Sequence, residues 1–289
     1  MARILVSGST GFIGKHLVRS LIEAGHDVMG MSRLDGDIAN LNTWYNLPPM
    51  DVVIHLASRT FVPDSWNDPL SFVETNLNGT ICCLEYCRMH NSRLIYLSSY
   101  LYGNPDHLPI SESANLHVNN PYGLSKKIAE ESCTFYFNNV GVSTVILRPF
   151  NVYGPGQSAD FLIPIIIDQV ISRKSIEVKD LNPKRDYIYI DDLIRAIINA
   201  IELDNGLFIF NLGSGISYSV AEVIECIQRI EGTTLPVTSS GEKRPGEIME
   251  TKADISKAKH VMGWSPRWSL ELGIAETISE IKKKVDTEG

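Results

Sequence analysis

The sequence predicts an α/β protein whose core is a doubly wound parallel sheet. Short continuous apolar runs of strand length alternate, along the first half of the chain, with longer segments of helical periodicity. A glycine-rich turn directly follows the first apolar run, and small or polar residues end the later runs. The chain has 289 residues, 44% of them apolar, which is enough to bury one large core or two small ones.

The individual strands and helices follow from these patterns. Apolar runs predict strands over residues 4–6, 27–32, 51–57, 93–98 and 143–148. Helical spacing predicts helices over residues 15–24, 72–90 and 122–138. Strands that alternate with helices pair in parallel, and such sheets bind ligands beyond the carboxyl ends of their strands. We therefore expect the functional residues just after each strand.

The alternation ends after Phe150, and a smaller, irregular cap is predicted over the strand ends. Turn-rich and glycine-rich segments replace the alternation of strands and helices. One further helix is predicted there, near residues 220–230. The larger domain is expected over residues 1–150 together with about 187–213, and the cap over residues 151–186 and 214–289.

Composition narrows the class of partner and the compartment. The net charge of −8 argues against nucleic acid as the main partner, because phosphate backbones bind basic surfaces. Three of the five cysteines, Cys82, Cys83 and Cys87, share one predicted helix, which favours a reducing, cytoplasmic location over a disulfide framework. No metal-ligand spacing and no run of membrane-spanning length is present, and Met1 lies so close to a strand that we expect no signal peptide.

The glycine-rich turn predicts a dinucleotide-binding site. Gly8, Gly11 and Gly14 stand at GxxGxxG spacing between the first strand and the first helix. Glycine there permits a tight turn and lets the backbone, including Phe12 and Ile13, approach a pyrophosphate at the helix N-terminus. An ordinary glycine-rich turn between a strand and a helix would show the same spacing.

The end of the second strand favours NADP(H), with NAD(H) as the alternative. An acidic residue there would bind the ribose 2′-hydroxyl of NAD, but the chain has Ser32 and Arg33, which suit the 2′-phosphate of NADP. A solvated surface arginine would give the same pattern. Asp37 could accept a hydrogen bond from the adenine amino group or stabilise a turn, and we place Ile38 in the same cofactor site.

Three residues form a candidate catalytic group. Tyr122 and Lys126 are four residues apart, on one face of a predicted helix that Pro121 begins. A nearby ammonium lowers the pKa of a tyrosine hydroxyl, so Tyr122 can exchange a proton with a C–O group during hydride transfer. Ser98, at the end of the fourth strand, can donate a hydrogen bond to the same oxygen. Taken alone, such a tyrosine is usually a packing residue and such a lysine is usually solvated.

These motifs together resemble the extended short-chain dehydrogenase/reductase family, which comprises NAD(P)-dependent sugar-nucleotide epimerases, dehydratases and reductases. The resemblance covers nearly the whole chain. Its motifs here are the glycine turn, His55-Leu56-Ala57, Asn76 with Gly79-Thr80, residues 98–103 (SSYLYG), residues 122–126 (YGLSK), residues 148–156 (RPFNVYGPG) and residues 185–192 (RDYIYIDD). The resemblance implies a Rossmann-type sheet with a substrate-binding cap.

The resemblance also implies the roles of single residues. It makes Ser98, Tyr122 and Lys126 the catalytic trio. The cofactor contacts that it adds are Leu56, Ala57, Asn76 and Pro149, besides Tyr122 and Lys126. The residues that it places at the nucleotide-sugar diphosphate are Asn151, Arg185 and Arg244, and Ser99 is a further substrate-binding residue. It implies a homodimer through the helices predicted over residues 72–90 and 122–138.

The cap-side residues have structural alternatives. Arg185 could pair with Asp186 or Asp191 instead of a diphosphate, and Asp191 and Asp192 fit the N-cap of a helix better than a binding site. Arg244 could likewise belong to an ion pair. No metal site is expected among these residues.

The reaction is less defined than the family. A 4,6-dehydratase of this family would carry an Asp-Glu pair after the hydroxyl residue of strand four, where this chain has Ser99 and Tyr100. Ser32 and Arg33 favour a reductase that reduces the 4-keto group of a nucleotide-linked 4-keto-6-deoxyhexose with NADPH. Such reductases often carry a carboxylate after the catalytic serine, which this chain lacks. The alternative is a 4-epimerase with tightly bound NAD. A hypothesis from a different functional class is a non-enzymatic sensor that binds the dinucleotide.

Overall fold

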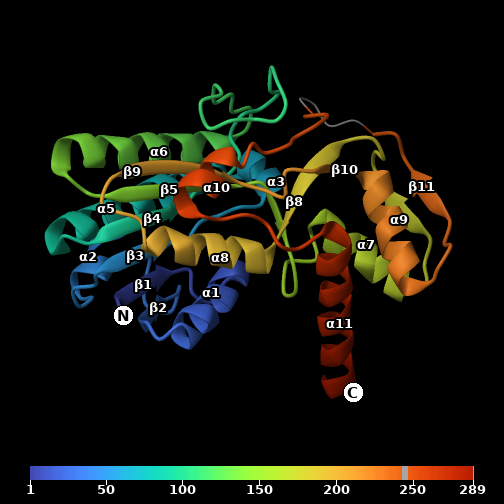
Figure 1. Ribbon diagram of the computed structural model, residues 1–289, viewed down its shortest axis with the longest axis horizontal. Helices are drawn as coiled ribbons and strands as arrows, with labels where there is room; N and C mark the ends of the chain where they lie inside the picture. The colour runs from blue at the N-terminus through green and yellow to red at the C-terminus, as the bar shows by residue number, and fades with distance from the viewer. Residues whose placement is uncertain (243–246, 289) are drawn as a thin grey trace.

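The computed structural model describes the backbone of residues 1–242 and 247–288 and the side chains of residues 1–242 and 247–283. Its centre is a six-stranded sheet in the order β2-β1-β3-β4-β5-β9, with every neighbouring pair parallel (Figure 1). The strands are β1 (Arg3–Ser7), β2 (Asp27–Met31), β3 (Val52–His55), β4 (Arg93–Leu97), β5 (Thr144–Pro149) and β9 (Leu207–Leu212). The predicted parallel, Rossmann-type fold is confirmed. Strand β9 is a sixth strand that was not among the predicted ones, although its residues 207–210 (LFIF) form an apolar run.

Helices cover both faces of this sheet (Figure 1). Those that pack over one face are α2 (Leu41–Tyr45), α5 (Gly79–His90) and α6 (Pro121–Val140), and those over the other are α1 (Phe12–Glu23), α8 (Ile190–Ile201) and α10 (Ser256–Met262). The inner strands β3, β4 and β5 are buried along their whole length, as continuous apolar strands between two helical layers must be.

The segment predicted as one helix over residues 72–90 has three parts. It runs through α4 (Pro69–Val73), a π-helical turn η1 (Glu74–Asn78) and then α5. The π-turn contains Asn76, whose side chain bonds outside the helix, to Arg59 and Ser125. Such π-turns occur often at functional sites. The short helix α3 (Val62–Asn67) precedes this segment.

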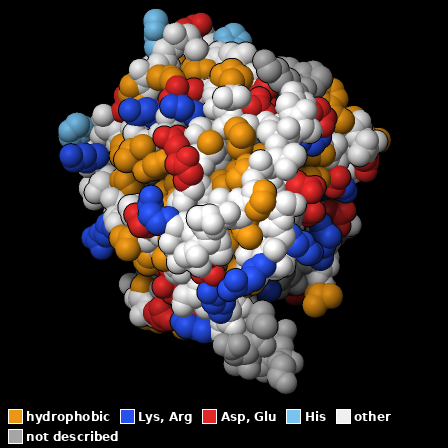
Figure 2. Space-filling model, turned by 90° about the vertical axis from the view of Figure 1, so that its right-hand side faces the viewer, with side chains coloured by type: hydrophobic (Ala, Val, Ile, Leu, Met, Phe, Trp, Pro, Cys, Tyr) orange, Lys and Arg blue, Asp and Glu red, His pale blue; other side chains and the backbone are white. Residues whose placement is uncertain are grey.

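The cap holds two small sheets and three helices. Strands β10, β8 and β6 form one sheet, and β11 pairs with β7 in the other. Their bounds are β6 (Asn151–Tyr153), α7 (Leu162–Ile171), β7 (Ile176–Val178), β8 (Lys184–Tyr189), β10 (Ser217–Ser219), α9 (Val220–Glu231), β11 (Val237–Ser239) and α11 (Leu270–Glu288). Figure 2 shows the cap end of the molecule, where apolar, basic and acidic side chains are interspersed.

One continuous apolar cluster joins the cap to the sheet. It runs from Ile4 and Leu17, beneath the sheet, to Ile166 in α7 and Ile224 in α9. Helix α10 packs against α8 and β9 of the large sheet, although the predicted cap range includes it. The predicted domain boundaries stay a prediction. None of the described helices is long and apolar enough to cross a membrane.

The carboxylate of Asp192, in helix α8, binds the segment that precedes helix α11. It is 1% exposed, accepts hydrogen bonds from the backbone N–H groups of Arg267 and Trp268, and pairs with Arg195. The predicted N-cap role for Asp191 and Asp192 is wrong. The residue that precedes α8 is Tyr189, and no side chain caps this helix.

We predict that Asp192→Ala lowers the free energy of unfolding by about 3 kcal/mol, because two backbone N–H groups and a guanidinium lose their acceptor. The matched control is Asp191→Ala, because Asp191 is the exposed neighbour in the same helical turn and should lose less than about 0.5 kcal/mol. Urea unfolding of both variants measures the difference. Equal losses would contradict the role of Asp192.

Candidate active site

The glycine-rich turn lies at the carboxyl edge of the sheet, between β1 and α1. Gly8 has a φ of +75°, and a Cβ there would lie 2.9 Å from the backbone nitrogen of Ala57. A Cβ on Gly14 would lie 2.1 Å from the carbonyl oxygen of Gly8. Both positions therefore require glycine, the first for its dihedral and both for close backbone approach.

The N-terminus of α1 suits a pyrophosphate. Gly11 precedes the helix and provides no side-chain cap, so the N–H groups of the first turn, at Phe12 and Ile13, lack intrahelical partners. These N–H groups and the helix dipole favour an anion at this position. The turn therefore fits a dinucleotide pyrophosphate.

The end of β3 lies directly beside this turn. The N–H of Leu56 donates to the carbonyl oxygen of Ser7, at 3.2 Å, and the N–H of Ala57 donates to the Ser7 hydroxyl, at 3.3 Å. The last residue of β5, Pro149, lies at the same edge, two strands from β3, and pairs in register with Leu212. The structure thus brings these three predicted cofactor contacts to the edge that holds the glycine turn.

At the end of β2, the residues predicted to select NADP have a neighbour that the sequence analysis missed. The carboxylate of Asp35 accepts hydrogen bonds from the N–H of Ser32, at 2.7 Å, and from the Ser32 hydroxyl, at 2.9 Å. These bonds hold the pKa of Asp35 below its usual value. Arg33 is exposed. A carboxylate therefore occupies the strand end that was interpreted as a pair of phosphate-binding residues.

Asp37 and Ile38 lie further along the same segment. The Asp37 carboxylate accepts from the N–H of Ala39, at 2.9 Å, which is the turn-stabilising alternative for this residue. Ile38 packs against the start of α5, where a Cβ on Gly79 would lie 2.7 Å from the Ile38 side chain. Their contacts with a cofactor stay predictions.

Asn76, in the π-helical turn, forms hydrogen bonds with two neighbouring segments of the site. Its amide nitrogen donates to the carbonyl oxygen of Arg59, at 3.0 Å, and to the hydroxyl of Ser125, at 2.9 Å. Its amide oxygen accepts from the N–H of Arg59, at 2.8 Å. Asn76 therefore ties the loop after β3 to the first turns of α6, and its predicted contact with the cofactor stays a prediction.

The predicted catalytic trio gathers where β4 ends and α6 begins. Asn120 caps α6 by accepting from the N–H of Gly123, at 2.7 Å, which places Tyr122 in the first helical turn. The Lys126 ammonium donates to the carbonyl oxygen of Leu97, at 2.6 Å. Ser98 follows Leu97, and its buried hydroxyl has no hydrogen-bond partner among the described residues. An unpaired buried hydroxyl at this strand end suits a substrate oxygen.

The electrostatics of the trio depend on burial. Burial lowers the pKa of Lys126 to about 7, and the charge of Glu130 acts in the opposite direction. Burial raises the pKa of Tyr122 to about 12, and a hydrogen bond with Ser99 opposes that shift. A cationic nicotinamide and a protonated Lys126 would both favour the Tyr122 phenolate.

On the cap side, the predicted diphosphate residues have protein partners. The Asn151 amide donates to the carbonyl oxygen of Asp186, at 3.2 Å. Arg185 pairs with Glu247 and donates to the carbonyl oxygen of Ile248, at 2.6 Å. Arg244 lies outside the described residues.

Arg185 pairs with neither of its predicted partners, Asp186 and Asp191. The carboxylate of Asp186 instead accepts from the N–H groups of Ser214, Gly215 and Ala253, and so holds the glycine turn after β9. Glu247 was not a candidate, because it stands far from Arg185 in the sequence. Within the described residues, no group of three or more potential metal ligands occurs.

Comparison with known proteins agrees with this geometry. A model of the NAD dependent epimerase/dehydratase family matches residues 4–213. A putative UDP-glucose 4-epimerase from Methanocaldococcus jannaschii is 33% identical, over 96% of this chain and 98% of its own length. A GDP-6-deoxy-D-mannose reductase from Pseudomonas aeruginosa is 28% identical, over 99% of both chains.

Solved structures share the whole fold. The UDP-glucose 4-epimerase of Thermotoga maritima, solved with UDP-glucose, has a TM-score of 0.91 at 27% identity and covers 98% of this chain and 99% of its own. The reductase RMD of Pseudomonas aeruginosa, solved with NADPH, has a TM-score of 0.90 at 27% identity and covers 98% of this chain and 100% of its own. The chain therefore belongs to the NAD-dependent epimerase/dehydratase family and is an enzyme of the NAD(P)-dependent sugar-nucleotide epimerase and reductase type.

Proposed function

We propose that this chain is a 4-epimerase of a UDP-linked hexose that works with tightly bound NAD. The observation that carries this proposal is the combination of the Ser98, Tyr122 and Lys126 geometry with full-length similarity to UDP-glucose 4-epimerases. Most of the similar proteins carry that name, so the comparisons favour the epimerase alternative over the reductase that the sequence analysis preferred.

Ser98, Tyr122 and Lys126 each have a separate role in the proton transfer at C4 of the sugar. Tyr122, as the phenolate, takes the proton of the C4 hydroxyl, and the Ser98 hydroxyl donates a hydrogen bond to the same oxygen. Lys126 supplies the positive charge that favours the phenolate. A dinucleotide held by the glycine turn would supply reversible hydride transfer at C4. Tyr122 then returns the proton, so that no net oxidation or reduction occurs.

The end of β2 supports NAD in preference to NADP. The Asp35 carboxylate can accept from a ribose hydroxyl, and its negative charge would repel a 2′-phosphate at the same strand end. Several similar structures also hold NAD, among them MoeE5 with UDP-glucuronic acid and the Thermus thermophilus 4-epimerase.

A reductase that uses NADPH is the second candidate. Exposed Arg33 stands beside Ser32, and a GDP-6-deoxy-D-mannose reductase matches nearly the whole chain. The chain has Ser99 directly after Ser98, where such reductases often carry a carboxylate, which counts against this candidate. A purified protein that retains stoichiometric NAD after isolation would favour the epimerase, whereas tighter binding of added NADPH would favour the reductase.

The proposal extends to the residues that bind the substrate and to the oligomeric state. We propose that Ser99, Asn151, Arg185 and Arg244 contact the nucleotide sugar, with Arg185 exchanging Glu247 for the diphosphate. We also propose a cytoplasmic homodimer that forms through α5 and α6. The apolar side chains that these two helices expose are Met89, Leu124, Phe135 and Val140.

We predict that Tyr122→Phe lowers turnover about 10²- to 10⁴-fold while the affinity for the dinucleotide stays nearly unchanged, because only the proton-transferring hydroxyl is removed. Steady-state kinetics on UDP-glucose and a fluorescence titration with the dinucleotide measure the two quantities. Tyr45→Phe, at an exposed position in α2, is the control and should behave as the wild type. Unaltered turnover in Tyr122→Phe would remove Tyr122 from the mechanism.

We predict that Asp35→Ser shifts the ratio of NADPH to NADH affinity about tenfold towards NADPH, because a carboxylate that repels the 2′-phosphate is lost. Asp27→Ser removes an exposed acidic side chain from the opposite end of the same strand and should leave the ratio unchanged. Competitive titration of the protein without cofactor gives both ratios. Equal shifts in the two variants would show that only net charge matters.

A further inference from the structure

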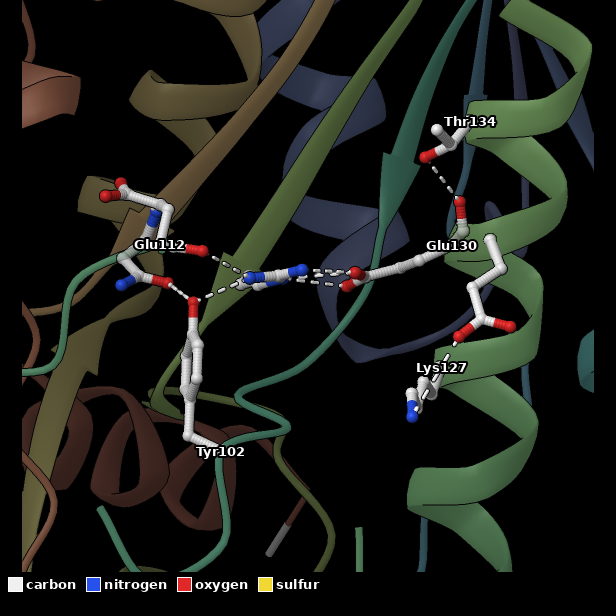
Figure 3. Close-up of polar contacts among 8 residues, drawn as sticks. Tyr102, Glu112, Lys127, Glu130 and Thr134 are labelled. Atoms are coloured by element: carbon white, nitrogen blue, oxygen red, sulfur yellow. Dashed lines mark hydrogen bonds and ion pairs between the residues drawn. The ribbon is translucent and has the colours of Figure 1, made fainter. Parts of the chain in front are cut away.

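A buried ion pair joins the catalytic helix to the strand beneath it. Arg148, in β5, donates from Nε to both carboxylate oxygens of Glu130, in α6, at 3.0 and 3.1 Å, and from Nη2 to one of them, at 2.6 Å (Figure 3). The two side chains are only about one-twentieth exposed, at 5% and 4%. Glu130 lies one helical turn after Lys126.

The other side of Arg148 holds the segment that follows Ser98. Its Nη1 donates to the Tyr102 hydroxyl, at 2.8 Å, and the Tyr102 hydroxyl donates to the amide oxygen of Asn211, at 2.6 Å. The Glu112 carboxylate accepts from the N–H of Asn211, at 2.8 Å. Figure 3 shows Glu130 on one side and Tyr102 and Glu112 on the other, and the Arg148 guanidinium donates hydrogen bonds to all three residues. One guanidinium thus links α6 to the loop that begins at Ser98.

Stability alone does not account for such a pair. Desolvation of two buried charges costs about as much as their attraction returns, and well-packed apolar side chains often serve equally well. The pair does fix geometry, because a bidentate guanidinium–carboxylate contact specifies the distance and the orientation of both elements. The pair thus fixes α6, which carries Tyr122 and Lys126, against β5, and the contact with Tyr102 joins the segment after Ser98 to the same guanidinium.

Glu130 is also the charged neighbour of Lys126. The titratable groups that face Lys126 from the surrounding elements are Tyr96, His55, Cys133 and Glu130. Burial raises the pKa of Tyr96 and of Cys133 and lowers that of His55 to about 3, so these three are neutral at neutral pH. The Glu130 carboxylate is therefore the negative charge that faces the ammonium within the described residues.

We propose that Glu130 and Arg148 are positioning residues for the reaction: their ion pair, together with Tyr102, holds the catalytic helix against the Ser98 segment, with Glu130 one helical turn from Lys126. This inference rests on the proposed catalytic roles of Tyr122 and Lys126. Without Glu130, Lys126 would lose its proton more readily, and the Tyr122 phenolate would lose the cation that favours it.

The test is the ionisation of Tyr122 in the protein with its dinucleotide bound. The phenolate absorbance of Tyr122 is the transition that the wild type shows and Tyr122→Phe lacks. We expect Glu130→Gln to move this transition to higher pH by about one unit, and to lower kcat about tenfold with KM changed less than about threefold. Glu131→Gln, at an exposed position that pairs only with Lys127, is the control and should change neither.

A double variant separates an effect on the catalytic site from a loss of protein stability. Glu130→Gln leaves Arg148 buried without a counter-charge, so Glu130→Gln/Arg148→Met removes both charges together. We expect the double variant to regain thermal stability while its Tyr122 transition stays at the higher pH. A double variant with the wild-type transition and kcat would overturn the proposal. Because the phenolate titration needs no sugar nucleotide, it tests this inference even if the protein proves not to be a 4-epimerase.

Discussion

A buried cation beneath the carboxyl end of β4 is the constraint on which the rest of the site depends. The Lys126 side chain is 2% exposed, and its ammonium lies 2.6 Å from the Leu97 carbonyl oxygen and 4.4 Å from the centre of the Tyr96 ring. Burial brings its pKa to about 7, so its charge at neutral pH depends on its neighbours. The proposed role of Tyr122 requires that charge, because a phenolate in a partly buried site needs a cation nearby.

The topology of the sheet explains why residues so far apart in the sequence meet. Parallel strands place all their carboxyl ends at one edge, so the glycine turn after β1, the Ser32 segment after β2 and Ser98 after β4 share that edge. The cap closes over it through a core that is continuous with the sheet. The fold thus brings the glycine turn and the candidate catalytic trio to one edge of the sheet.

Much of this arrangement could be predicted from local patterns. The parallel sheet, the glycine turn and the pair Tyr122 and Lys126 follow from periodicity and short spacings, which a single sequence displays directly. Features that depend on contacts between distant segments could not be predicted in the same way. The partner of Arg185 is Glu247, and Arg148 meets Glu130 only because β5 passes under α6.

The end of β2 shows what an interpretation from residue types alone leaves out. Ser32 and Arg33, considered as residue types, suit a 2′-phosphate, but the turn that follows brings Asp35 back onto Ser32. The chain then presents a carboxylate at the place where a cation was expected. The conformation of this short turn, which residue types alone do not specify, therefore sets which side chains lie at the strand end.

The most direct test of the epimerase proposal follows the C4 hydrogen of the substrate. Purified protein, with only the dinucleotide it retains, is incubated with UDP-glucose that carries deuterium at C4, and the products are identified by NMR. The account predicts UDP-galactose that still carries the deuterium at C4, formed without any added reductant. An absence of epimerisation, together with NADPH-dependent reduction of a 4-keto-6-deoxy sugar nucleotide, would contradict it and establish the reductase.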